Sequence, residues 1–96
     1  MATLIKTDGT KQTVSPSDKK GFTYDELIKL IGGSCEDVEF VTFYDDSCMC
    51  IDEMGKFNGQ SLNREASRVF LRNLGTYDAI MGNAILLTEK ECNKIH

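Results

Sequence analysis

Five segments of the chain combine apolar content with the turn-bounded length that is typical of β-strands. They are residues 2–6, 11–14, 36–43, 47–52 and 79–87. Residues 36–43 alternate most regularly, and because both of their faces carry apolar side chains, we expect partial cover on both faces of this strand. Asp8-Gly9 supplies the turn of a first hairpin, since glycine adopts a positive φ without a steric clash, and Asp45-Asp46 supplies the turn of a second.

Three further segments carry the signals that begin and end short α-helices. Thr23 and Glu26 have the spacing of a capping box, in which the hydroxyl and the carboxylate bind free N–H groups of the first turn. Apolar residues at helical spacing follow, and Gly32-Gly33 ends this helix because glycine readily takes the left-handed conformation. The first helix is the best-marked element of the chain.

Ser61 is expected to cap a second helix that runs to about Asn73 and ends at Gly75. Thr88 and Glu91 repeat the capping-box spacing and predict a short final helix. The resulting order is β-β-α-β-β-α-β-α. It predicts an α+β fold, in which a small mixed or mostly antiparallel sheet of about five strands carries two or three short helices on one face. The pattern leaves the strand order open.

The length of 96 residues suits a single domain, residues 1–96, because a second core needs roughly another 50 residues or more. No apolar run approaches the roughly 18 residues of a membrane span. The first residues also lack the charged and apolar regions of a signal peptide. We therefore expect a soluble domain in the cytoplasm of a host cell, with no membrane attachment.

Charge is unevenly distributed along the chain, whose 11 basic and 15 acidic residues give a net charge of −4. This balance argues against binding nucleic acid through a broad positive surface. Residues 36–53, the acidic segment, contain seven acidic side chains and no basic ones. All three arginines follow shortly afterwards, at Arg64, Arg68 and Arg72. The charge is thus polarised along the sequence.

The spacing of Arg64, Arg68 and Arg72 places their side chains on one side of the second helix, outside its apolar stripe. Because a guanidinium holds phosphate or carboxylate groups with two parallel hydrogen bonds, the arginines predict an anionic ligand or an acidic partner. A solvated helix face paired with the acidic segment is the simpler explanation of the same spacing. Pairing with the acidic segment of a second copy is a further alternative, and it predicts a homodimer.

Four cysteines raise the question of a metal site. Two of them would lie on the same face of a strand, but their Cys-x-Cys spacing differs from the Cys-x-x-Cys knuckles of zinc ribbons. We expect all four to be reduced and to pack as small apolar groups, with no metal or other cofactor. They are Cys35, Cys48, Cys50 and Cys92. A structural disulfide would require export, which the sequence does not support.

Few side chains are suited to catalysis. A nucleophilic serine or cysteine needs a base beside it, and the only histidine is His96, at an end that frays. Two carboxylate pairs suit metal binding or acid–base chemistry, but both fall in predicted turns, where acidic residues are common for solvation. These pairs are Asp45-Asp46 and Asp52-Glu53. No phosphate-binding glycine-rich motif is present, and we do not expect an enzyme.

Several short motifs occur in a familiar order along the chain. They are Phe22-Thr23-Tyr24-Asp25-Glu26-Leu27, Leu30-Ile31-Gly32-Gly33, Ile51-Asp52-Glu53-Met54-Gly55-Lys56, Asn63, Ala66 and Ile80-Met81-Gly82-Asn83-Ala84. With these motifs, the chain from Ile5 to Leu87 resembles an uncharacterised family of short domains of unknown function found in bacteria, phages and mobile elements. The resemblance implies a phage or plasmid accessory protein without assigned catalytic residues. Asn63 belongs to this pattern and joins the three arginines as a candidate ligand contact.

Three functions follow as hypotheses. The first is a non-enzymatic accessory protein of a phage or mobile element that modulates a host process, such as defence, by binding a host component. The second is an oligomeric sponge that sequesters a phosphate-bearing signalling molecule, such as a cyclic nucleotide, at the arginines. The third is an acidic DNA mimic that inhibits a host nuclease; it ranks last because DNA carries one charge per about 1.7 Å of its axis, far more than a net charge of −4 supplies.

Overall fold

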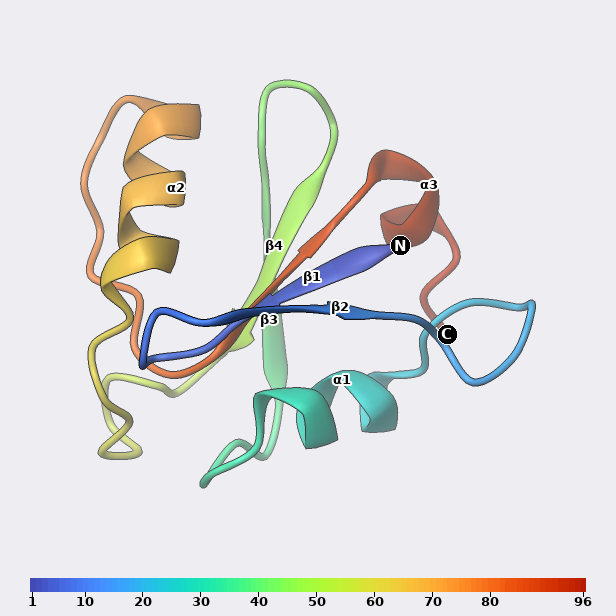
Figure 1. Ribbon diagram of the computed structural model, residues 1–96, viewed down its shortest axis with the longest axis horizontal. Coiled ribbons are helices and arrows are strands. Elements are labelled where there is room, and N and C mark those ends of the chain that lie inside the picture. Colours follow the sequence, from blue (N-terminus) through green and yellow to red (C-terminus); the bar gives the residue numbers. More distant parts are fainter.

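The sheet contains five strands, β1 to β5, in the order β2-β1-β5-β4-β3, and every neighbouring pair is antiparallel. Figure 1 shows helix α2 to one side of the strands and helix α3 to the other. The computed structural model describes all residues from 1 to 96. The strands are β1 (Ala2–Ile5), β2 (Lys11–Val14), β3 (Val38–Thr42), β4 (Cys48–Asp52) and β5 (Ala84–Leu87). The helices are α1 (Tyr24–Ile31), α2 (Arg64–Leu74) and α3 (Glu89–Asn93). The predicted α+β fold and the predicted order of its elements are confirmed.

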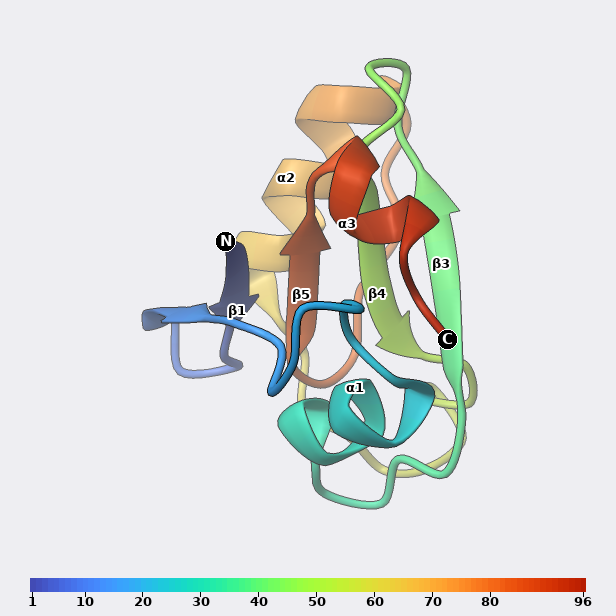
Figure 2. The same cartoon turned by 90° about the vertical axis from the view of Figure 1, so that its right-hand side faces the viewer.

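Helices cover both faces of the sheet, and not one face as the sequence led us to expect (Figure 2). α1 and α3 pack on one face, and α2 packs on the other. The side chains of β4 explain this arrangement, because the buried Cys48 and Cys50 face α1 and α3, whereas the buried Met49 faces α2. Successive side chains of a strand point to opposite faces, so an apolar strand requires a cover on each side. None of α1, α2 and α3 has the length and apolar content that a membrane span requires.

Both predicted capping boxes are confirmed. At the start of α1, the Thr23 hydroxyl accepts a hydrogen bond from the backbone N–H of Glu26 at 3.1 Å, and the Glu26 carboxylate accepts one from the backbone N–H of Thr23 at 3.0 Å. Thr88 and Glu91 make the same two hydrogen bonds at the start of α3, at 3.2 and 2.9 Å. These local signals fix the beginnings of the two helices that share one face of the sheet.

Two predicted boundaries near α2 are wrong. Asn63 and not Ser61 caps α2, and β5 begins only at Ala84. The reason is that the two connecting segments pair with each other. The backbone N–H of Asn63 donates to the carbonyl of Ile80 at 2.8 Å, and that of Gly82 donates to the carbonyl of Ser61 at 2.7 Å. The pairing satisfies backbone groups of the segment before Ala84, which would otherwise have bonded within a longer β5.

The Asn63 side chain joins three parts of the fold from a fully buried position. Its amide nitrogen donates to the carbonyls of Ile5 and Gly82 at 3.0 and 2.9 Å, and its amide oxygen accepts from the backbone N–H of Ala66 at 3.0 Å. A single side chain therefore connects β1, the turn before β5 and the first turn of α2.

We predict that Asn63→Ala lowers the free energy of unfolding by about 3 kcal/mol, because it removes a helix cap and leaves two buried carbonyls without a donor. Urea denaturation followed by circular dichroism measures the change. Asn93→Ala is the matched control, since Asn93 is exposed at the end of α3 and its replacement should change stability by less than about 0.5 kcal/mol. Equal effects of the two substitutions would contradict the connecting role of Asn63.

Candidate functional site

A disulfide joins Cys48 of β4 to Cys92 of α3. The two Cα atoms lie 6.6 Å apart, although the cysteines are 44 positions apart in the sequence. The expectation of four reduced thiols is therefore wrong for this pair. No local motif indicates the bond, because it depends on how α3 packs on the sheet. The one available signal is that Cys92 is the only apolar residue of α3, and so the residue that a buried helix face would use.

The other two cysteines, Cys35 and Cys50, are free thiols. Burial raises the pKa of the Cys50 thiol to about 12, and the neighbouring Cys35 adds to this effect. Burial also raises the pKa of Cys35 to about 11, assisted by the negative charge of Asp52. Both are thus protonated at neutral pH, and a protonated thiol is a poor nucleophile and metal ligand. No group of three or more His, Cys, Asp or Glu side chains is placed to hold a metal ion.

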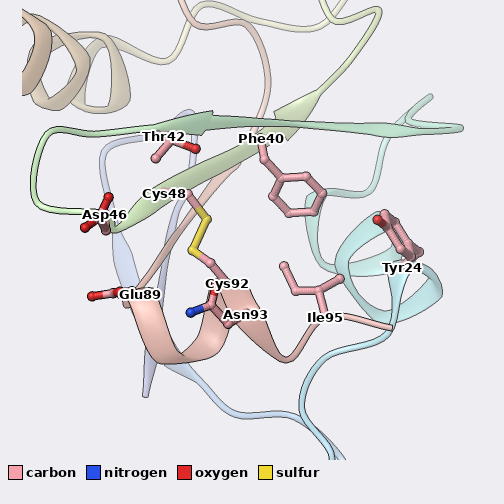
Figure 3. A pocket seen from close by; sticks show the side chains of 9 residues that line it. All are labelled: Tyr24, Phe40, Thr42, Asp46, Cys48, Glu89, Cys92, Asn93 and Ile95. Atoms are coloured by element: carbon pink, nitrogen blue, oxygen red, sulfur yellow. A yellow bond between two sulfur atoms is a disulfide. The ribbon is translucent and has the colours of Figure 1, made fainter.

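The disulfide forms part of the wall of a cavity of about 510 Å³, which we call the disulfide pocket (Figure 3). The pocket lies between the β3–β4 hairpin, the start of α1, and α3 with the residues that follow it. Its lining consists of Tyr24, Phe40, Thr42, Asp46, Cys48, Glu89, Cys92, Asn93 and Ile95. The volume falls within the range of about 300–1,000 Å³ that is usual for small-molecule sites.

The two ends of the disulfide pocket differ in chemistry. Tyr24, Phe40 and Ile95 form an apolar end, where the two aromatic rings meet edge to face with their centroids 6.0 Å apart. Asp46 and Glu89 lie at the opposite end (Figure 3). Neither carboxylate has an ion-pair partner. No basic side chain lines the pocket, so its polar end is acidic.

The backbone holds Asp46 in a conformation that few residues adopt. Its φ of 69° makes it the only non-glycine residue of the chain with a positive φ. It lies in the β3–β4 turn, where its N–H donates to the carbonyl of Phe43 at 3.0 Å and the N–H of Phe43 donates to the carbonyl of Ser47 at 2.8 Å. Aspartate tolerates this left-handed conformation better than most residues. The turn therefore sets the position of a carboxylate at the edge of the pocket.

The three arginines that the sequence marks as ligand contacts lie on α2, across the sheet from the disulfide pocket. Arg64, Arg68 and Arg72 are all exposed, and together we call them the arginine face. Their acidic neighbour is Glu65 and not the acidic segment, since the Glu65 carboxylate lies 3.9 Å from Arg68 and 3.6 Å from Arg72. Lys11 of β2 reaches the same carboxylate at 3.5 Å. The Glu65 carboxylate is thus shared by three basic side chains, while Arg64 makes no ion pair.

Sequence reasoning missed Glu65 and Lys11 at the arginine face. The i,i+3 spacing of Glu65 and Arg68 is a local signal for their pairing, whereas no local pattern shows that Lys11 lies next to α2. Asn63, the fourth candidate, does not join the arginines. Its side chain is buried and its amide is already used within the fold, so it does not reach a ligand on that face.

A buried carboxylate, Asp52 at the end of β4, organises the loop that follows it. It accepts hydrogen bonds from the side chains of Gln60 and Asn58 at 3.0 and 3.1 Å, and from the backbone N–H of Met54 at 3.0 Å. Burial acts to raise the pKa of Asp52, but these hydrogen bonds outweigh it and hold the pKa below its usual value. At neutral pH the carboxylate is therefore ionised, and its oxygens already accept hydrogen bonds from the loop. This favours a structural role over that of a general acid.

Nearly the whole length of the chain can be assigned to a family. Residues 1–95 match DUF3846, a domain of unknown function. The chain belongs to the DUF3846 family. The resemblance to a family of short domains of unknown function is thereby confirmed. No match was found among curated proteins or among solved structures.

We predict that Cys92→Ser lowers the free energy of unfolding of this DUF3846 domain by about 2–4 kcal/mol under oxidising conditions, because the disulfide closes a long loop of the unfolded chain. Urea unfolding with and without a reductant measures the difference. The native domain should lose the same stability when it is reduced, and Cys92→Ser should not respond to the reductant. Cys35→Ser is the control, since Cys35 forms no disulfide. If the reductant leaves the stability of the native domain unchanged, the Cys48–Cys92 disulfide is contradicted.

We predict that Asp52 contributes to the acid sensitivity of the DUF3846 domain. Because its pKa is lowered from 3.8 on folding, its contribution is complete well above pH 3.8 and is lost as the pH falls through the folded pKa. Asp52→Asn should therefore lower stability at about pH 7 and flatten the decline in unfolding free energy below about pH 5. Urea unfolding across this range measures both effects. Glu53→Gln, at an exposed neighbour, should keep the native profile, and an unchanged decline in Asp52→Asn would refute the prediction.

Proposed function

We propose that this DUF3846 domain is a non-enzymatic accessory protein of phages or other mobile elements, which modulates a host process by binding an acidic host component through the arginine face. Anti-defence activity, in which that component belongs to host immunity, is the form of the proposal that the resemblance to phage domains favours. The observation that carries the proposal is the exposure of three guanidiniums along one side of α2. The proposed place of action is the cytoplasm of the host cell, where thiol reductants would act on the disulfide.

The arginine face has the properties of a protein-binding surface. The side chains of Arg68 and Arg72 are 72% and 66% exposed, so their guanidiniums are accessible despite the contact with Glu65. α2 packs on the sheet through its opposite side, and a partner can therefore engage the arginines without disturbing the core. Leu71 of the same helix is 42% exposed and adds an apolar contact, and interfaces are enriched in arginine.

Binding fits the chemistry of the domain better than catalysis does. The two free thiols have raised pKa values and are protonated at neutral pH. The buried carboxylate of Asp52 is occupied by hydrogen bonds from its own loop. The groups that reach the surface, in contrast, are suited to electrostatic recognition.

A phosphate-bearing small molecule, such as a cyclic nucleotide held by an oligomer, is the second candidate for the arginine face. Guanidiniums bind phosphate well, but Glu65 competes for Arg68 and Arg72, and an extended acidic protein surface can also engage the unpaired Arg64. A second copy of the domain is one such surface, since the acidic segment would face the arginines in a homodimer. DNA mimicry ranks last, because the arginine face interrupts an already sparse negative charge.

We predict that replacing the three arginines of this face with glutamine weakens capture of the host partner about tenfold or more, because the variant loses three charged contacts of the interface. Affinity purification from host lysate at two salt concentrations, with mass spectrometry of the retained proteins, measures this. Small molecules released by denaturation are analysed in parallel and would identify a phosphate-bearing ligand. Glu65→Gln should act in the opposite direction and strengthen capture, since it removes the competing carboxylate.

A matched control removes three cations elsewhere. Lys19, Lys90 and Lys94 line a separate cavity beside α3, and their combined replacement by glutamine changes the net charge by the same amount. A partner that is lost with the arginines and kept with this lysine variant supports the proposal. If both variants lose the partner equally, capture depends on net charge alone, which contradicts the proposal. If the arginine variant retains the partner, the assignment of the arginine face is overturned.

A further inference from the structure

We propose that the disulfide pocket binds a small organic cation, in which an ammonium group is carried on an apolar body. This site is separate from the arginine face, because α1 and α3 cover one face of the sheet and α2 covers the other. The two assignments therefore rest on different residues, and the pocket is assigned to the oxidised domain.

The charge around the disulfide pocket selects for a cation. Asp46 and Glu89 stand at one end without ion-pair partners, and none of the nine lining residues is basic. The lysines nearest in sequence, Lys90 and Lys94, line a different cavity together with Lys19. An anion would meet two uncompensated carboxylates, whereas an ammonium group would supply the partner that both lack.

The opposite end of the pocket selects for an apolar body. Tyr24 is 49% exposed although its ring packs edge to face on Phe40, so a ligand placed there would remove aromatic surface from water. Ile95 and the disulfide continue this apolar surface toward the acidic end (Figure 3). The aromatic faces also attract a cation that passes over them. An arylalkyl ammonium ion matches both ends at once.

The walls of the pocket are held in place before a ligand arrives. The disulfide ties α3 to β4, and the capping box at Thr88 fixes the first turn of α3. The residues after α3 are held by backbone hydrogen bonds, since the N–H of His96 donates to the carbonyl of Phe22 at 3.1 Å and the N–H of Tyr24 donates to the carbonyl of His96 at 3.2 Å. A pocket that is already formed loses little conformational entropy on binding.

Three probes of similar size and different charge test the proposal. They are 3-phenylpropylammonium, 3-phenylpropan-1-ol and 3-phenylpropionate, each titrated into the native, oxidised domain at physiological salt. Heteronuclear NMR gives both the affinity and the location of binding, because backbone amides around the pocket shift when it is occupied. We expect the ammonium ion to bind about tenfold more tightly than the alcohol, and the carboxylate to bind least.

A double variant isolates the contribution of the acidic end. Asp46→Asn with Glu89→Gln should reduce the affinity for the ammonium ion to that for the alcohol and leave the alcohol unaffected. Asparagine also adopts the positive φ that position 46 requires, so the turn is preserved. The control is Glu36→Gln with Glu53→Gln, two exposed residues outside the pocket whose replacement changes the net charge equally.

The outcomes separate recognition from general attraction. Ammonium binding that falls in the pocket variant and persists in the control supports the proposal. Equal affinities for the ammonium ion and the alcohol would overturn it, as would an equal loss in the two double variants. If the ammonium ion binds but shifts only the NMR signals of amides outside the pocket, the assignment of the binding site to this pocket is overturned.

Discussion

The interior strand β4, which lies between β5 and β3, is apolar on both of its faces, and the rest of the structure depends on this constraint. Met49 requires a cover on one side, and Cys48 and Cys50 require one on the other. A chain of 96 residues meets both demands with short helices, so that α2 covers one face and α1 and α3 share the second. The larger hollow, the disulfide pocket, lies on this shared face beside α1 and α3. The opposite face carries one continuous helix whose outer side is free for charged residues.

Sequence patterns predicted the elements whose signals are local. The capping boxes at Thr23 and Thr88 involve residues three positions apart, and the structure contains both. The errors lie where distant segments compete with local preference. Ser61 is a good cap by type, but its carbonyl pairs with Gly82, and the helix begins after Asn63 instead. The same pairing keeps the residues before Ala84 out of β5. For residues 36–43, the apolar side chains on both faces indicated that both faces of the sheet would be covered. The sequences of the helices do not show which face each helix covers.

The two candidate sites differ in the same way. The arginine face follows from spacing along a single helix, so its members were predictable, whereas Lys11 joins it from a strand through tertiary packing. The disulfide pocket draws its lining from α1, the β3–β4 hairpin and the end of the chain. No window of sequence contains these segments together. The Cys48–Cys92 bond was missed for this reason, and also because the absence of a signal-peptide pattern pointed to a reducing compartment.

The docking of His96 has a practical consequence for anyone who handles this domain. Its backbone makes two hydrogen bonds, one with the backbone of Phe22 and one with the backbone of Tyr24. The neighbouring Ile95 belongs to the pocket lining. Residues that follow position 96, whether native or added as an affinity tag, therefore emerge directly beside the cavity and can occupy or shield it. The amino end lies outside this surface, since Met1 is 82% exposed and does not line the pocket, and its one tie to α3 is the ion pair with Glu91 at 3.5 Å. Reporter fusions and immobilisation chemistry should accordingly be placed ahead of β1.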